Sequence, residues 1–194
     1  MYRSVPANIV LIGFSGTGKS TAGKLIASRL GWTFVDTDSL IVAHFGMSIA
    51  EVFAEQGEAI FRAVERDIVA TVCAGTRQVV SLGGGAPVDL ENRQRILDKN
   101  FIVCLGAAPE TILQRLRTGP GAEKRPMLAG EDPLGRIRRL LEARREAYEI
   151  ADVTIDTEGR TPADVSDAVL KAVENSRGWT GCASAPTSEN SEIT

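Results

Sequence analysis

Short runs of apolar, β-branched residues alternate along the chain with longer segments in which apolar residues recur at helical spacing. This alternation is typical of a parallel sheet that is covered by helices on both faces, because each face of the sheet must be buried. The pattern therefore predicts an α/β fold in three layers, with strands at Asn8 to Ile12, Thr33 to Asp36, Gln78 to Leu82, Phe101 to Leu105 and Val153 to Asp156.

Helical spacing marks the segments between the strands, and a capping signal locates one of their ends. Ser48, followed three residues later by Glu51, has the pattern of a capping box, which predicts a new helix just after Gly46. We predict helices at Lys19 to Leu30, Ser39 to Phe45, Ile49 to Ala54, Glu58 to Ala74, Leu90 to Asp98, Pro109 to Arg117, Pro133 to Ile150 and Pro162 to Asn175.

Length and composition favour one soluble domain. A chain of 194 residues suits a single domain with a full core, which we place at residues 1–175. From Ser176 on, the chain is rich in Ser, Gly, Thr and Ala without periodicity, so we expect a disordered tail over residues 176–194. The net charge of −3 lacks the basic excess typical of nucleic-acid-binding proteins, and we expect no nucleic-acid partner.

The N-terminal residues show no signal peptide, and no segment approaches the roughly 18 apolar residues of a membrane span. We therefore expect a cytoplasmic protein without a membrane partner. We also expect a monomer. The cysteines Cys73, Cys104 and Cys182 are odd in number and far apart, which argues against a disulfide framework or a zinc site.

The sequence GFSGTGKS, Gly13 to Ser20, fits the phosphate-binding pattern G-x-x-x-x-G-K-[ST] between a strand and a helix. Its glycines let backbone N–H groups converge on one anion, and the following helix adds its positive dipole end. We expect Lys19 to reach the nucleotide phosphates and Ser20 to bind Mg²⁺. The alternative is an ordinary glycine-rich turn. The predicted residues of the ATP site here are Gly16, Thr17, Gly18, Lys19, Ser20 and Thr21.

Acidic and glycine-rich segments follow the next two strands. Asp36 and Asp38 are separated by one residue on a segment expected to be extended, so both carboxylates should face the cleft at the carboxyl edge of the sheet. One could hold Mg²⁺ or its water while the other accepts a hydrogen bond from a substrate hydroxyl; alternatively, Asp38 caps a helix. The three glycines in Ser81 to Gly85 allow backbone to approach a ligand closely.

Arginines supply the positive charge that an anionic acceptor requires. Arg62 and Glu65 are spaced to share one helical face, so the acid could hold the guanidinium in position to grip a carboxylate. The loop from Arg117 to Ala129 is long for a compact domain and is typical of a mobile lid, with Arg125 as its functional residue. Arginines near the lid could instead belong to a solvated helix face; the best candidates for that role are Arg136, Arg138 and Arg139.

Taken together and in this order, GFSGTGKS, DTD, FR, LGGG, RP and R-x-x-x-Y closely resemble the shikimate kinases, over about Asn8 to Val169. The resemblance implies a nucleoside-monophosphate-kinase-like fold with a five-stranded parallel sheet in the order 2-3-1-4-5. It also implies transfer of the ATP γ-phosphate to the 3-hydroxyl of shikimate, with Mg²⁺. The partners would then be small molecules, ATP and shikimate.

The resemblance also implies roles for individual residues. Asp38 matches the carboxylate that binds shikimate hydroxyls, and Asp36 the one associated with magnesium water. Arg62 and Arg144 match the arginines that grip the shikimate carboxylate, with Gly84 donating from its backbone. Because Arg145 directly follows Arg144, the sequence leaves open which of the two grips the carboxylate.

On the nucleotide side, Arg125 matches the arginine that reaches the transferring phosphate, which makes Lys19, Asp38 and Arg125 the candidate catalytic residues. Arg117 matches the arginine near adenine, and Arg160 with Pro162 matches the loop around the nucleotide base. The apolar walls of the substrate pocket would be Phe53 and Phe61.

Other functions share parts of this pattern. A gluconate-type carbohydrate kinase has the phosphate loop and the size, but does not predict DTD, GGG and FR together. A regulatory module that binds ATP without transfer would be favoured if Lys19, Asp38 or Arg125 were missing. A nucleoside monophosphate kinase would phosphorylate AMP or CMP, whereas this acceptor site has arginines suited to a carboxylate.

Overall fold

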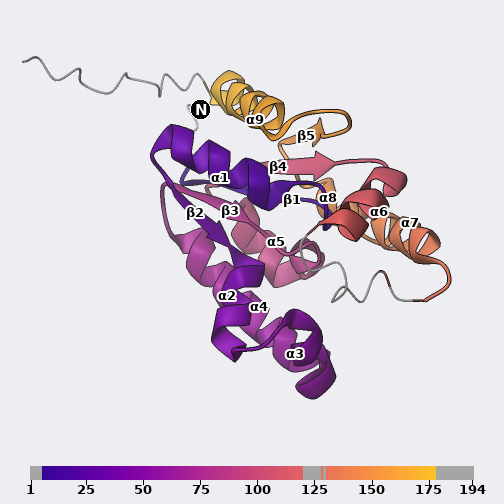
Figure 1. Cartoon of the computed structure of the whole chain (residues 1–194). Coiled ribbons are helices and arrows are strands. Elements are labelled where there is room, and N and C mark those ends of the chain that lie inside the picture. Colours follow the sequence, from indigo (N-terminus) through magenta and orange to yellow (C-terminus); the bar gives the residue numbers. More distant parts are fainter. Residues whose placement is uncertain (1–5, 120–127, 129, 178–194) are drawn as a thin grey trace, which may run out of the picture.

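The computed structural model describes residues 6–119, 128 and 130–177. In this part of the chain, one parallel sheet has the order β2-β3-β1-β4-β5, which confirms the predicted fold class (Figure 1). The strands are β1 (Asn8–Ile12), β2 (Thr33–Asp36), β3 (Gln78–Ser81), β4 (Phe101–Gly106) and β5 (Val153–Asp156).

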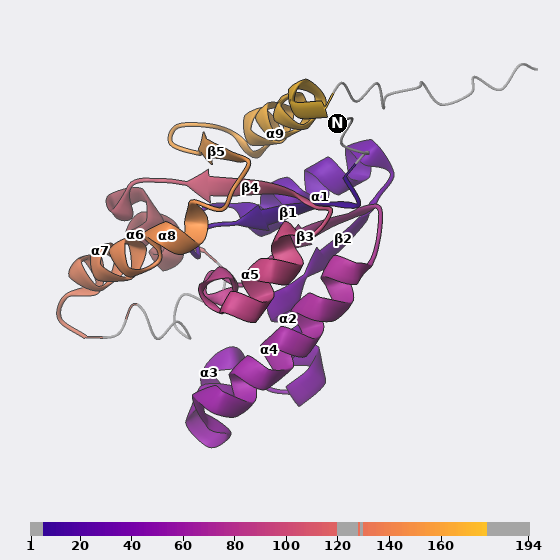
Figure 2. The ribbon, with the colours of Figure 1, turned by 180° about the vertical axis from the view of Figure 1, so that it is seen from behind.

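Helices cover both faces of the sheet, as Figures 1 and 2 show from opposite sides. Side chains of α1 and α9 pack on one face and those of α4, α5 and α8 on the other. The helices are α1 (Lys19–Leu30), α2 (Thr37–Phe45), α3 (Ile49–Glu55), α4 (Gly57–Ala74), α5 (Leu90–Leu97), α6 (Pro109–Thr118), α7 (Pro133–Ala143), α8 (Arg145–Tyr148) and α9 (Pro162–Arg177), with a 3-10 turn at Ala86–Val88.

The central strand β1 shows why the sequence produces three layers. Ile9 and Leu11 belong to the apolar cluster on the α1 side, and Val10 and Ile12 to the cluster on the opposite side. All four side chains are fully buried. Successive side chains of a strand point to opposite faces, so a continuous apolar run requires cover on both. Helices on both faces therefore hold the sheet in place. Because all of its strands are parallel, their carboxyl ends lie along the same side of the sheet.

Two segments differ from the sequence prediction. The helix expected from Pro133 to Ile150 breaks at Arg144, whose φ of −106° and ψ of 2° end α7 and precede α8. The helix expected from Ser39 begins at Thr37, because the carboxylate of Asp36 accepts a hydrogen bond from the Ser39 N–H and caps it. Asp38 therefore lies in the first helical turn, and the prediction that Asp36 and Asp38 share one extended segment was wrong.

Other local predictions are confirmed. Ser48 and Glu51 form the predicted capping box at the start of α3. Cys73 and Cys104 are buried free thiols, while Cys182 lies outside the described residues. Helix α9 continues to Arg177, two residues past the expected end at Asn175.

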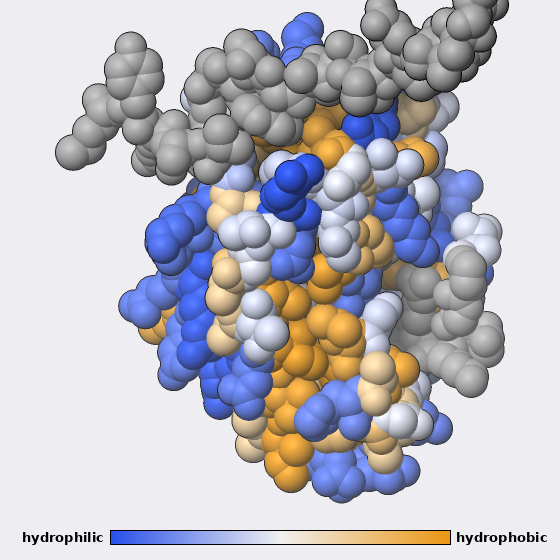
Figure 3. Space-filling view, turned by 90° about the vertical axis from the view of Figure 1, so that its left-hand side faces the viewer, coloured by the Kyte–Doolittle hydropathy of each residue, from blue (hydrophilic) through white to orange (hydrophobic). Residues whose placement is uncertain are grey.

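The surface is not uniformly polar. Figure 3 shows apolar surface running down the side of the molecule on which β2 and α2 lie. Large exposed apolar side chains in α2, α3 and α4 include Leu40, Val42, Phe53 and Ile60. Among the described helices, none combines the length and the apolar character that crossing a membrane requires.

A buried polar cluster joins the strands at the edge of the sheet opposite the carboxyl ends. The Asn8 side chain donates to the carbonyl of Gly75 at 2.8 Å and to Oδ1 of Asn100 at 3.0 Å. Its own Oδ1 accepts from the Gln78 N–H at 3.1 Å. Asn8 is fully buried, and these hydrogen bonds satisfy its side chain while they join β1 to β3 and to Asn100.

We expect Asn8→Ala to lower the free energy of unfolding by about 2–4 kcal/mol, because it removes the buried hydrogen bonds that Asn8 makes with Gly75, Gln78 and Asn100. Urea denaturation measures the change. Asn175→Ala, at an exposed position of α9, is the matched control and should be nearly neutral. Equal stabilities of the Asn8 variant and wild type would contradict this account of the cluster.

Candidate active site

The phosphate loop connects β1 to α1 at the carboxyl edge of the sheet. Lys19 is the first residue of α1, and its ammonium donates hydrogen bonds to the carbonyls of Gly13 at 2.8 Å and Phe14 at 2.9 Å. The side chain is 8% exposed. Burial lowers the pKa of Lys19, and the negative charges of Asp38 and Asp36 oppose that shift. The loop therefore holds a buried cation close to both acids of the DTD segment.

Ser20 and Asp36 provide oxygen atoms beside this loop. The Ser20 hydroxyl donates to Oδ2 of Asp36 at 2.6 Å, while Oδ1 of Asp36 is occupied by the Ser39 N–H. A hydroxyl and a carboxylate are hard oxygen ligands of the kind Mg²⁺ prefers. The pair predicted from sequence as the metal site is thus brought together, with chemistry that fits the ion.

Asp38 lies in the first turn of α2 and is half-buried, like Asp36. Burial raises the pKa of Asp38 to about 6; the charge of Lys19 opposes this shift, and the charges of Asp36 and Glu65 reinforce it. At neutral pH the group is mostly ionised, and it can still accept a proton. A carboxylate with a pKa near the working pH is suited to acid–base chemistry as well as to hydrogen bonding.

Three consecutive glycines follow β3, and a Cβ atom on any of them would lie close to charged side chains of the site. A Cβ atom on Gly83 would lie 2.5 Å from Oδ1 of Asp38. On Gly84 it would lie 3.4 Å from a guanidinium nitrogen of Arg144, and on Gly85 it would lie 3.2 Å from one of Arg62. The loop Gly83–Gly85 is called the triple-glycine loop below. Its missing side chains are what allow the charged groups to pack against its backbone.

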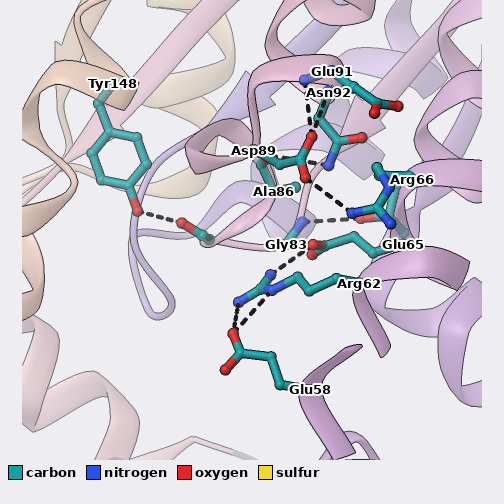
Figure 4. A network of polar contacts seen from close by, with 12 residues as sticks. Glu58, Arg62, Glu65, Arg66, Gly83, Ala86, Asp89, Glu91, Asn92 and Tyr148 are labelled. Carbon is teal, nitrogen blue, oxygen red and sulfur yellow. Dashed lines mark hydrogen bonds and ion pairs between the residues drawn. The ribbon is translucent and has the colours of Figure 1, made fainter. Parts of the chain in front are cut away.

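Arg62 is held on α4 by two acids, as Figure 4 shows. Its guanidinium donates to Glu65 at 2.6 Å and to Glu58 at 3.3 Å. Glu65 is 2% exposed; burial raises its pKa, and the hydrogen bond from Arg62 opposes the shift. The ion pair predicted from the spacing of Arg62 and Glu65 is therefore confirmed, and the pair is far more buried than an ordinary surface pair.

Arg144 approaches the triple-glycine loop from the break between α7 and α8. Its guanidinium lies 5.4 Å from the ring centroid of Phe14 in the phosphate loop. The neighbouring Tyr148 hydroxyl donates to the Gly84 carbonyl at 2.7 Å, and Figure 4 shows its ring reaching the loop from the side opposite Arg62. Arg145, by contrast, is largely exposed and pairs with Glu142 at 3.1 Å. Arg144 and Tyr148, four residues apart, thus both reach the triple-glycine loop.

Arg62 and Arg144 line a common pocket of about 360 Å³. Its lining residues are Glu58, Arg62, Gly85, Val88, Asp89, Ala143 and Arg144. The predicted aromatic walls Phe53 and Phe61 are not among these lining residues. The rings of Phe53 and Phe61 are 4.5 Å apart, and the Arg62 guanidinium lies 5.2 Å from the Phe61 centroid. Phe61 is buried and Phe53 is 37% exposed, so Phe61 is the inner member of the pair and packs beside Arg62.

A second pocket of about 250 Å³ lies on the other side of the phosphate loop. It brings together predicted nucleotide residues from the loop and from the segment after β5. The lining residues are Thr17, Gly18, Thr21, Ala22, Arg115, Thr157, Arg160, Pro162 and Val165.

Two arginines predicted to bind the nucleotide, Arg117 and Arg125, are not among the residues that line this pocket. Arg117 is exposed in the last turn of α6, and Arg125 lies outside the described residues, as does most of the expected lid. The roles of both stay predictions. Arg115, two residues before Arg117, was missed by sequence reasoning although it lines the pocket. Residues at i and i+2 point to different sides of a helix, so contact with one side does not follow from contact with the other.

We expect Asp38→Asn to stabilise the fold above about pH 6. The folded pKa of Asp38 is raised above its ordinary value of 3.8, so the ionised form opposes folding and stability is lost as the pH rises from about 4 to 6. The neutral isostere avoids this loss, which is on the order of 3 kcal/mol for a pKa raised from 3.8 to about 6. Thermal or urea unfolding at pH 4 and pH 8 measures it: the gain should be present at pH 8 and absent at pH 4. A variant less stable than wild type at pH 8 would show that the charge is compensated.

The comparisons with known proteins identify the family. The family model for shikimate kinase matches residues 15–174. The chain is 45% identical over 175 residues to a shikimate kinase from Symbiobacterium thermophilum, covering 90% of this chain and 99% of the relative. It is 43% identical over 167 residues to one from Thermodesulfovibrio yellowstonii, covering 86% and 95%.

Among solved structures, a shikimate kinase from Acinetobacter baumannii in complex with shikimate is similar with a TM-score of 0.83 at 31% identity, covering 91% of this chain and 97% of that one. Family model, sequence relatives and solved structure all agree over most of the chain. With the phosphate loop, the acids and the arginines in place, the chain belongs to the shikimate kinase family of ATP-dependent kinases.

Proposed function

We propose that this protein transfers the γ-phosphoryl group of ATP to the 3-hydroxyl of shikimate, giving shikimate 3-phosphate and ADP, with Mg²⁺. One observation carries the proposal. The phosphate loop separates two pockets: Gly18 lines one of them, and Phe14 contacts Arg144, which lines the other. A donor bound on one side and an acceptor bound on the other would meet at Lys19.

The acceptor pocket suits a small molecule with a carboxylate at one end and hydroxyls at the other. Arg62 and Arg144 offer guanidinium groups from two different elements, and such groups bind a carboxylate in a bidentate manner. Asp38 is the acid that would orient the hydroxyl, and the backbone of Gly84 would contribute a donor. Because the positive and negative groups come from separate elements, the substrate can bind in one orientation only.

On the donor side, Lys19 and the backbone of the phosphate loop would bind the β- and γ-phosphates. Ser20 and Asp36 would hold Mg²⁺, directly or through water, and the ion would neutralise charge that develops on the phosphate oxygens. Arg125 would add positive charge at the transferring group. Phosphoryl transfer needs little covalent chemistry from the protein, so positioning and charge stabilisation account for most of the catalysis.

The base of ATP would occupy the pocket lined by Arg160 and Pro162. The tail, which can begin only after Arg177 at the end of α9, the lid over about residues 117–129 and the monomeric, cytoplasmic state stay predictions.

The direct test is ADP release from ATP and Mg²⁺ with shikimate, gluconate or AMP as the acceptor. Shikimate-dependent release of ADP, with gluconate and AMP inactive, supports the proposal. Release that is independent of any acceptor, or that depends on gluconate or AMP, would replace it with one of the other kinase classes.

We expect Lys19→Met to lower kcat by at least about 10²-fold, because the variant loses the charge that faces the transferred phosphate while Met keeps the length and volume of the stem. A coupled assay for ADP measures the loss. Lys24→Met is the control on the same helix, since Lys24 is exposed and its ammonium lies 5.9 Å from the Phe34 ring centroid. Near wild-type turnover in the Lys19 variant would contradict the proposed kinase mechanism.

A further inference from the structure

The Arg62 guanidinium, which lines the acceptor pocket, has an acid on each of two opposite sides (Figure 4). Its Nη1 donates to Glu65 at 2.6 Å, whereas its Nε and Nη2 both donate to one oxygen of Glu58 at 3.3 Å. Nη1 and Nη2 lie against Gly85, where a Cβ atom would be 3.2 and 3.4 Å from them. The Nε–Nη2 edge, which can take a carboxylate in a bidentate manner, is therefore occupied by Glu58.

The two acids hold Arg62 with very different strength. The Glu65 side chain is 3% exposed and its contact is short, so breaking the pair would leave a buried charge without a partner. The Glu58 side chain is 66% exposed and its contacts are long, and exposed pairs of this kind contribute little to stability. Glu65 is therefore a permanent anchor of the guanidinium, whereas Glu58 can leave it for solvent.

A second acid of the pocket, Asp89, is fixed in place. Its Oδ1 accepts from the backbone N–H groups of Glu91 and Asn92 at 2.9 and 3.1 Å, at the start of α5. Its Oδ2 accepts from Arg66 at 3.2 Å. In the described part of the chain, the Glu58 carboxylate has hydrogen bonds from Arg62 alone. Of the two acids that line the pocket, Glu58 is therefore the one that can move.

We propose that Glu58 is an internal competitor for the carboxylate of the acceptor, and that it thereby sets the affinity of the pocket for its substrate. Before the acceptor binds, Glu58 occupies the Nε–Nη2 edge of Arg62. On binding, the substrate carboxylate takes that edge and Glu58 turns out to solvent. This inference rests on the proposed function, because it takes the pocket as the site of the acceptor's carboxylate.

This competition has a specific consequence for ligand affinity. A ligand that needs the Nε–Nη2 edge of Arg62 is weakened by the cost of displacing Glu58, which for an exposed ion pair is about 2- to 10-fold in Kd. A ligand without a carboxylate charge does not need the edge and is not weakened. Arg62 thus keeps a charged partner until a carboxylate arrives that is also held by contacts elsewhere in the site.

The test is calorimetric binding of shikimate, and of its uncharged methyl ester, to wild type and Glu58→Gln. We expect the Kd of shikimate to fall about 2- to 10-fold and that of the ester to change less than about 1.5-fold. KM for shikimate should fall in parallel, with KM for ATP and the Tm close to wild type. An unchanged or raised Kd of shikimate would overturn the proposal, because Glu58 would then be neutral or a second anchor of Arg62.

Glu58→Asp separates direct contact from charge. The variant keeps the negative charge on a stem that is one methylene shorter, which withdraws the carboxylate from Arg62. If occupation of the guanidinium edge is what competes, Glu58→Asp should bind shikimate more tightly than wild type, as Glu58→Gln does. Wild-type affinity in the aspartate variant would show that the charge acts through space, and the displacement would be overturned.

Glu91→Gln is the matched control. Glu91 pairs with Arg95 at 3.5 Å with the same spacing of four residues along a helix, and its side chain is also 66% exposed. It does not line the pocket, so both Kd values should equal those of wild type. A gain in shikimate affinity equal to that of Glu58→Gln would overturn the proposal in favour of an effect of net charge. Failure of wild type and Glu91→Gln to bind shikimate at all would instead contradict the proposed function.

Discussion

The close approach of the triple-glycine loop to Asp38, Arg144 and Arg62 is the constraint on which the acceptor side of this site depends. The loop follows β3, which lies between β1 and β2 in the sheet, so it reaches both the phosphate loop and the DTD segment. The backbone there can contact three charged groups because it carries no side chains of its own. Tyr148 then holds the loop from the far side through the Gly84 carbonyl.

This arrangement concentrates charge where water is largely excluded. Burial lowers the pKa of Lys19 and raises those of Asp38 and Glu65, so each ionised group is less favourable in the folded protein than in solvent. The compensating interactions lie elsewhere, in the fully apolar strands and in the Asn8 cluster at the opposite edge of the sheet. Buried charged groups that lower the stability of the fold are expected at a functional site, because bound ligands supply their missing partners.

Much of the fold could be predicted from the sequence, because the strands are short apolar runs and the helices between them carry clear apolar periodicity. The break at Arg144 could not, since the residues from Glu142 to Tyr148 include good helix formers and neither Gly nor Pro. In the folded chain the break is accompanied by a tertiary contact, the hydrogen bond from Tyr148 to the Gly84 carbonyl. The capping role of Asp36 was missed for a related reason: it depends on where α2 begins.

In the candidate site, too, local patterns could be predicted from the sequence and tertiary contacts could not. Motif spacing located the phosphate loop, the two acids and the Arg62–Glu65 pair, because each is a local pattern. Arg115 could not be singled out, since its partners Gly16 and Thr157 lie 99 and 42 residues away in the sequence. The choice between Arg144 and Arg145 likewise required the helix break, which turns one toward the loop and leaves the other exposed.

The most direct test of this account is the steady-state kinetics of Gly83→Ala. The φ angle of Gly83 is not in the left-handed region, so alanine brings no backbone strain. The new methyl group would lie 2.5 Å from Oδ1 of Asp38, with no other atom within 3.4 Å. Displacement of that carboxylate should lower kcat/KM for shikimate about 10- to 100-fold while KM for ATP and the Tm stay close to wild type. Gly106→Ala, whose nearest contact would be at 4.0 Å, is the control. Wild-type kinetics in the Gly83 variant would contradict the claim that this backbone positions the acceptor site.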